Sequence, residues 1–258
     1  MSLTFQSGNK LKNIAKIQGG KYNGKTISLN TKLDEIDETD FKKLRIPNNG
    51  VFQLLPDKTA SRQIIYITGA SGSGKSTFTR KFVKEYKKIW KDRDVYLFSA
   101  LKEDESLDEI KPKRFRIDES LVSNPLDIED LKDSLVIMDD IDVINPKKVK
   151  DAVFHILNEI LQIGRHFNIT CIVTNHLPTD FQRTRIILNE SHIIVYFPLS
   201  AGGKVKYMLE QYVDLDPVQI KYFKKLQTRW VCIYRHFPQL YLSERECGLL
   251  NQDTDDEN

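Results

Sequence analysis

Eight consecutive residues, Gly69 to Ser76, follow the pattern G-x-x-x-x-G-K-S. Glycines allow the backbone to bend so that successive N–H groups point at one centre, and such a bend before a helix binds phosphate groups. Lys75 can neutralise the outer phosphates of a nucleotide, and Ser76 offers a hydroxyl of the kind that Mg²⁺ prefers as a ligand. The pattern therefore predicts a phosphate-binding loop.

The elements around this loop occur in the order that such a site needs. A β-branched and aromatic run at 64–67 predicts a buried strand, and the apolar spacing from Phe78 to Ile89 predicts a helix running to about Trp90. A Gly/Ser-rich turn that matches the pattern by chance is the alternative. The residues expected to contact the nucleotide are those of the loop and the one after it: Gly69, Ala70, Ser71, Gly72, Ser73, Gly74, Lys75, Ser76 and Thr77.

A second chemical group follows the continuous apolar run at 135–138, where Asp139 and Asp140 stand together. A buried parallel strand with an acid at its carboxyl end can hold a nucleotide's metal ion through water, the role expected for Asp139 with Ser76. Asp140 can orient or deprotonate an attacking water. The separation of 64 positions between Lys75 and Asp139 leaves room for an intervening strand. An acidic turn after a core strand is the alternative explanation.

A third polar group ends the apolar run at 169–173, where Thr174, Asn175 and His176 follow one another. A polar side chain at this position can sense the γ phosphate. We prefer Asn175, because an amide can donate to a phosphate oxygen and accept from water. The alternative is an asparagine that caps the next turn.

The remaining segments extend an α/β core on both sides. Residues 1–60 alternate apolar runs with turn signals and predict a small β extension; 61–200 form the P-loop core, with a helix over 147–164 and a fifth strand over 193–197. Residues 201–250 predict helices, one of them capped by Asp216, and a terminal hairpin. The acidic tail at 251–258 is expected to be disordered. A short strand is expected at 115–117.

Composition excludes several classes of protein. The net charge of +3 is too small for a polycation, so any nucleic-acid surface must be local. Cys171, Cys232 and Cys247 show no metal-ligand or disulfide spacing and predict reduced, buried thiols. No run approaches the roughly twenty apolar residues that span a bilayer, and no secretion signal is seen, so an intracellular, soluble protein is expected.

Three segments together resemble one family: GASGSGKST, LVIMDDID and GRHFNITCIVTNHLPTDFQRTRIILNESHIIVYFP. The chain resembles the poxvirus-type DNA-packaging ATPases of large DNA viruses and virophages, a branch of the FtsK/HerA superfamily, over roughly residues 63–198. The resemblance implies a RecA-like, additional-strand sheet and a homo-oligomeric ring. It also implies ATP and Mg²⁺ as cofactors, with double-stranded DNA pushed into a preformed capsid, at a portal-like vertex, inside an infected cell.

The resemblance also bears on single residues. Asp140 stands where much of the superfamily has Glu, and Asn175 where cellular relatives often have Gln. Rings of this type place active sites between subunits, where a neighbour's arginine stabilises the transferring phosphoryl group. Arg165 is the first candidate for that arginine, with Arg183 and Arg185 as rivals.

Two other functions share a phosphate loop. A nucleotide or nucleoside kinase would use Arg183 and Arg185 in a lid, although two adjacent acids favour water activation. A GTP-dependent switch needs a guanine-reading N-K-x-D pattern, which residues 174–176 do not provide. Two loops could grip DNA phosphates: the basic, aromatic segment 113–116 and the segment 202–204.

Overall fold

The computed structural model describes residues 1–6, 11–31, 40–180, 184–200 and 204–250. Within these residues the largest sheet has ten strands in the order β4-β14-β13-β12-β11-β6-β10-β9-β7-β8. Six neighbouring strands are parallel: β6 (Ile64–Thr68), β7 (Val95–Ser99), β8 (Lys113–Arg114), β9 (Leu135–Asp139), β10 (Thr170–Asn175) and β11 (Ile193–Tyr196). Four antiparallel strands continue from β11: β12 (Val231–Tyr234), β13 (Leu240–Ser243), β14 (Glu246–Leu249) and β4 (Lys43–Arg45).

The strand order confirms the expected RecA-like, additional-strand core. β10 lies between β6, which leads into the phosphate loop, and β9, which ends in the acids. The register aligns their carboxyl ends, because Asn175 pairs with Thr68, and Thr174 pairs with Asp139. Since parallel strands end at the same edge of a sheet, loop and acids meet although they are far apart in the sequence.

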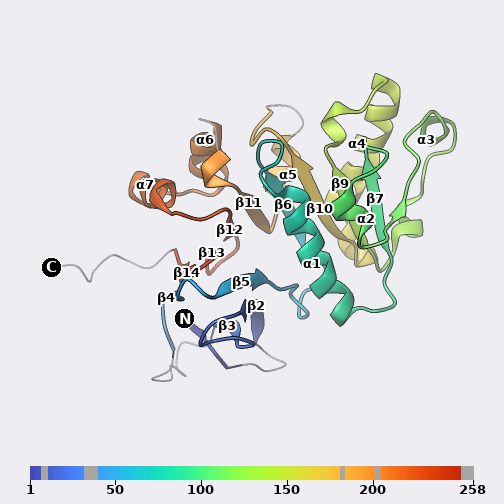
Figure 1. Ribbon diagram of the computed structural model, residues 1–258. Coiled ribbons are helices and arrows are strands. Elements are labelled where there is room, and N and C mark those ends of the chain that lie inside the picture. Colours follow the sequence, from blue (N-terminus) through green and yellow to red (C-terminus); the bar gives the residue numbers. More distant parts are fainter. Residues whose placement is uncertain (7–10, 32–39, 181–183, 201–203, 251–258) are drawn as a thin grey trace.

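Helices cover both faces of this sheet (Figure 1). On one face, α1 (Lys75–Ile89) packs against Ile65, Ile67 and Ile137 with the N-terminal strands beside it. On the other face, the core is formed chiefly by α4 (Lys147–Ile163), α5 (Thr184–Glu190), α6 (Lys204–Tyr212) and α7 (Pro217–Lys225). Two one-turn helices, α2 (Glu105–Asp108) and α3 (Ser120–Ser123), lie in the connection from β7 to β9. Alternate residues of each strand face opposite layers, which explains the continuous apolar runs.

The expected N-terminal β extension is present as a separate antiparallel sheet with the order β1-β3-β2-β5. Its strands are β1 (Ser2–Thr4), β2 (Lys12–Gln18), β3 (Thr26–Asn30) and β5 (Val51–Leu54). The segment between β3 and β5 contains β4, which pairs with β14 at the edge of the large sheet. In Figure 1 the blue N-terminal strands accordingly lie beside the red C-terminal strands.

Several details differ from the sequence predictions. The strand expected at 115–117 is wrong in position, because the residues in register with β7 are Lys113 and Arg114. The Phe115 N–H makes one further hydrogen bond to the Leu97 carbonyl oxygen, and its ring stacks on Phe98 with centroids 4.4 Å apart. The C-terminal hairpin has a third strand, β14. Asp216 caps α7 as expected, through a capping box with Gln219.

Other expectations concern cysteines, membranes and the tail. All three cysteines are free and buried, as expected. No helix among the described residues combines the length and the apolarity that crossing a bilayer requires. The acidic tail at 251–258 lies outside the described residues.

Candidate active site

The phosphate loop joins the carboxyl end of β6 to the first turn of α1. Gly72 and Gly74 have φ values of +73° and +112°, which residues with a Cβ rarely adopt, and Gly74 directly precedes the helix. The first N–H groups of a helix have no partner within it and carry partial positive charge, and no acidic residue lies in this first turn. The turn of α1 that contains Lys75, Ser76 and Thr77 therefore offers N–H groups to an anion.

Lys75 is buried, with 7 % of its surface exposed, and lies at the centre of the site. Its ammonium nitrogen donates to the Gly69 carbonyl oxygen at 3.0 Å and is 3.2 Å from Nδ1 of His176. It is also 4.0 Å from Oδ1 of Asp140. The lysine is thus held between the loop and the strand-end residues, where a phosphate chain would exchange these contacts for its own oxygens.

Asp139 is fixed by hydroxyl groups from the strands on both sides. The Ser99 hydroxyl at the end of β7 donates to Oδ2 at 3.0 Å, and the Thr174 hydroxyl of β10 donates to Oδ1 at 2.7 Å. With 2 % of its surface exposed, this carboxylate is held in one orientation. It has no basic partner among these contacts, which is consistent with an acid that supports a cation nearby.

Ser76 has an acidic neighbour that the sequence did not indicate. Its hydroxyl donates to Oδ2 of Asp104 at 3.0 Å, while Oδ1 of Asp104 caps α2 by accepting from the Leu107 backbone. In the described residues no cluster of three or more His, Cys, Asp or Glu forms a metal cage. Hard oxygens from Ser76 and Asp104, with Asp139 farther back, fit a magnesium ion that takes its other ligands from phosphates and water.

Asp140 is held beside Lys75 in a conformation that is unusual for a residue with a side chain. Its φ is +45°, and its backbone N–H donates to the Thr174 hydroxyl at 3.1 Å. Oδ2 lies 2.9 Å from Nε2 of His176. Burial raises the pKa of Asp140, an effect that the Lys75 charge partly offsets. A carboxylate with a raised pKa is a better proton acceptor than an exposed one.

His176 connects the two charged groups. When Nε2 carries the ring proton and donates it to Asp140, Nδ1 is the acceptor for the Lys75 ammonium. If the Lys75 ammonium moved to a phosphate chain, Nδ1 of His176 would lose its partner, while Nε2 would keep its contact with Asp140. Sequence reasoning preferred Asn175 to this residue. The signal for His176 was its place next to a strand end in register with Asp139.

Asn175 points elsewhere in this structure. Its amide nitrogen donates to the Tyr66 hydroxyl at 3.4 Å, and its buried amide oxygen has no hydrogen-bond partner in the described chain. Its backbone oxygen accepts from the Gly69 N–H at 3.2 Å, so the residue also ties β10 to the phosphate loop. The sensor role of its side chain stays a prediction.

The candidate arginines lie at opposite edges of the sheet. Arg165 is exposed in the turn before β10, at the amino edge, about 20 Å along the strand from the phosphate loop. Arg185 is exposed in the first turn of α5, on the segment that leaves the carboxyl end of β10. Arg183 lies outside the described residues. Neither described arginine contacts the residues of the site in its own chain, and the role of an arginine across a subunit interface stays a prediction.

The loops considered for DNA contact have partners within the chain. Lys113 pairs with Asp94, Arg114 with Asp108 and Arg116 with Asp118, each at 2.6 Å. Such exposed pairs are weak and can open, but they lower the local positive charge. Of the segment 202–204, only Lys204 lies within the described residues, at the start of α6.

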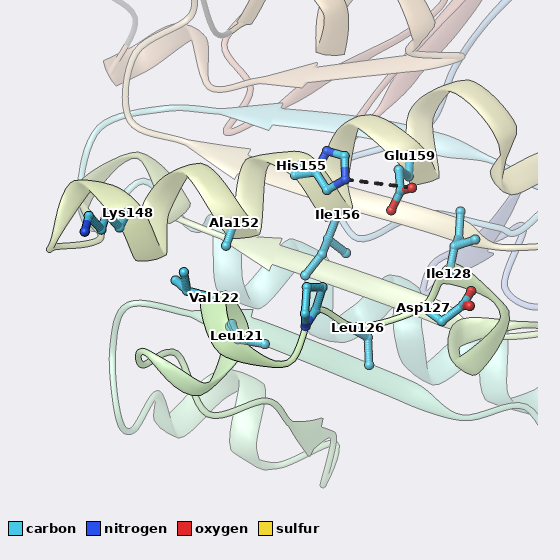
Figure 2. Close-up of a pocket in the computed structure, with 11 residues that line it drawn as sticks. Leu121, Val122, Leu126, Asp127, Ile128, Lys148, Ala152, His155, Ile156 and Glu159 are labelled. Carbon is cyan, nitrogen blue, oxygen red and sulfur yellow. Dashed lines mark ion pairs between the residues drawn. The ribbon is translucent and has the colours of Figure 1, made fainter.

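A separate hollow of about 490 Å³ lies between α4 and the segment that contains α3. Figure 2 shows Ala152 and Ile156 of α4 facing Leu121 and Val122. His155 and Glu159 lie on the same helix, with Nε2 of His155 4.0 Å from Oε1 of Glu159. No residue of the phosphate loop lines it, so it is not part of the active site.

One comparison with known proteins defines the family. Over 239 residues the chain is 38 % identical to an uncharacterized protein, V3, from Sputnik virophage, covering 92 % of this chain and 95 % of V3. The chain belongs to the V3 family. A scan of protein-family models finds no match.

Solved structures resemble this V3-family chain more remotely. The genome packaging NTPase B204 of Sulfolobus turreted icosahedral virus 2, in complex with AMP, gives a TM-score of 0.48 at 11 % identity, covering 72 % of this chain and 98 % of B204. The pCW3 conjugation coupling protein TcpA gives 0.47 at 11 % identity, covering 93 % of this chain and 77 % of TcpA. Similarities at this level of identity and TM-score do not allow the function of those proteins to be assigned to this chain, so a function must be argued from the residues of the site.

Proposed function

We propose that this V3-family protein is an ATP-hydrolysing motor that moves double-stranded DNA into a viral capsid. The observation that supports it most is the meeting of Lys75, Asp140 and His176 at the carboxyl edge of the sheet, beside Ser76 and Asp139. The resemblance of residues 63–198 to packaging ATPases and the virophage origin of V3 favour the packaging role over other uses of the same chemistry.

In this proposal each residue has one task. The loop Gly69–Ser76 and Thr77 would bind the phosphates through the N–H groups that have no partner within the described chain, since those of Gly69 and Ser73 donate to backbone oxygens. Lys75 would leave the Gly69 carbonyl to contact the outer phosphates. Ser76 and Asp139, with Asp104 beside Ser76, would hold a Mg²⁺ ion, whose charge would neutralise that of the phosphates. Asp140 accepts the proton of the attacking water, and His176 orients that carboxylate through the 2.9 Å contact. Asn175 is proposed to report the state of the γ phosphate to the loop through its backbone contact.

The same proposal includes an assembly. A homo-oligomeric ring would let Arg165, or else Arg183 or Arg185, stabilise the phosphoryl group bound by the next subunit. DNA would be gripped through its phosphates, which makes binding independent of sequence and sensitive to salt. The capsid, at a portal-like vertex in the infected cell, is the proposed docking partner.

A turnover experiment tests the proposal. We expect ATP hydrolysis that long duplex DNA stimulates, and a loss of roughly a hundredfold or more in Lys75→Ala, because outer-phosphate charge is then unopposed. Lys88→Ala, at the exposed end of the same helix, is the matched control and should keep full turnover. The mass of the nucleotide-bound protein measures the ring. Stimulation by a small phosphate acceptor, with no effect of DNA, would instead indicate a kinase.

A further inference from the structure

Two hollows flank the phosphate loop, and they differ in chemistry. One, of about 330 Å³, is lined by Gly69, Ala70 and His176 and so lies on the side of the catalytic acid. The other, of about 510 Å³, is lined by residues 72–74 and Thr77 on the loop side, and neither Asp139 nor Asp140 lines it. Its volume is within the usual range for small-molecule sites. A nucleotide with its outer phosphates near His176 would extend its other end into this second hollow.

The second hollow has aromatic walls. Trp230, which precedes β12, is partly exposed and contacts Phe78 of α1 edge to face, with centroids 5.1 Å apart. Phe197, which follows β11, is buried against the loop: a Cβ on Gly69 would lie 2.8 Å from its ring. An aromatic ring with an accessible face is a stacking platform for a nucleobase. Residues of the loop and Trp230 both line the hollow.

The hollow also carries a fixed acceptor. Oε2 of Glu244, in the β13–β14 turn, accepts from the Arg229 backbone N–H at 2.8 Å and from the Thr228 hydroxyl at 3.4 Å. Within the described part of the chain, Oε1 accepts no hydrogen bond. A carboxylate held by one oxygen can receive an amino group of a base or a sugar hydroxyl with the other. Lys81 and Arg229 add positive charge at the rim.

We propose that this hollow binds the nucleoside part of the nucleotide, with the base stacked on Trp230 and a donor of the base or sugar bonded to Glu244. The inference rests on the proposed nucleotide hydrolysis and adds a role for the C-terminal strands, which lie outside the three segments that carry the family resemblance. Trp230 is then a binding residue that distinguishes a nucleoside phosphate from a bare polyphosphate.

The test compares ADP with pyrophosphate, which lacks the nucleoside. Calorimetric titration of Trp230→Leu should show an affinity for ADP that is roughly ten- to a hundredfold weaker, the usual effect of losing one stacking ring, while pyrophosphate binding changes less than about twofold. Trp230→Phe keeps an aromatic face and should retain most of the ADP affinity. Glu244→Ala should weaken ADP and not pyrophosphate.

Fluorescence gives an independent reading, because Trp90 and Trp230 are the two tryptophans of the chain. Trp90 contacts the Tyr86 ring, with centroids 4.6 Å apart, at the far end of α1, about 20 Å from the loop. ADP should therefore quench the emission of Trp90→Phe but not that of Trp230→Phe. Equal ADP affinity in wild type and Trp230→Leu, or equal losses for ADP and pyrophosphate, would overturn the inference. Failure of the wild type to bind either compound would instead overturn the proposed hydrolysis.

Discussion

Acid should loosen the strand that carries the phosphate loop, through His192. This residue precedes β11, and its Nδ1 accepts from the Ile64 backbone N–H, at the start of β6, at 2.8 Å. An imidazole that accepts through Nδ1 at this position must be neutral there. Burial lowers the pKa of His192 from 6.5 to about 4, with further lowering by His236 and by the charges of Arg62, Lys12 and Arg235.

The lowered pKa of His192 determines the direction and the size of the change in folding stability with pH. The unfolded chain takes up the proton near pH 6.5 and the folded chain near pH 4, so stability is lost as the pH falls between these values. At about 1.36 kcal/mol for each pKa unit, the whole effect is about 3 kcal/mol, and about 2 kcal/mol of it is reached by about pH 5.

Urea unfolding at about pH 7 and about pH 5 measures the effect. His192→Asn keeps an acceptor near the Ile64 N–H without titrating, so its free energy of unfolding should fall by about 2 kcal/mol less than that of the wild type between these pH values. His155→Asn, at an exposed position on α4, should behave as the wild type does. If His192→Asn and the wild type lost the same stability, the reasoning would be refuted.

Three further predictions concern the active site. Gly69→Ala places a Cβ 2.6 Å from the Ser73 hydroxyl and should weaken ADP binding at least about tenfold in a calorimetric titration, through distortion of the loop. Asp140→Asn should lower turnover by about 10²- to 10⁴-fold. In the wild type, turnover should rise with pH as Asp140 loses its proton, with a pKa above the ordinary 3.8. A rise centred at or below pH 3.8 would contradict the assignment of Asp140 as the base. Mixing Arg165→Ala with Lys75→Ala subunits should restore turnover that neither has alone, whereas recovery only with Arg185→Ala would assign the role to Arg185.

Sequence reasoning predicted the parts of the site that depend on local pattern. The loop, Asp139 and the helix boundaries of α1 and α4 follow from spacing, capping and apolar periodicity, which are properties of one segment. Ser99, Asp104 and His176 depend on strand register and on where a one-turn helix folds back, which are properties of the tertiary fold. The pairing of β4 with β14 was missed for the same reason, since three-residue strands carry almost no pattern of their own.

The turn that bears Glu244 is itself tied to the start of the chain. The Phe52 N–H of β5 donates to the Glu244 carbonyl oxygen at 2.7 Å, and the Ile46 N–H donates to the Arg245 carbonyl oxygen at 2.9 Å. A shortened protein beginning near residue 61 would therefore lose the brace behind one wall of the hollow, besides an edge strand. A minimal version of this protein would have to retain both chain ends, because the first fifth of the polypeptide supports the last.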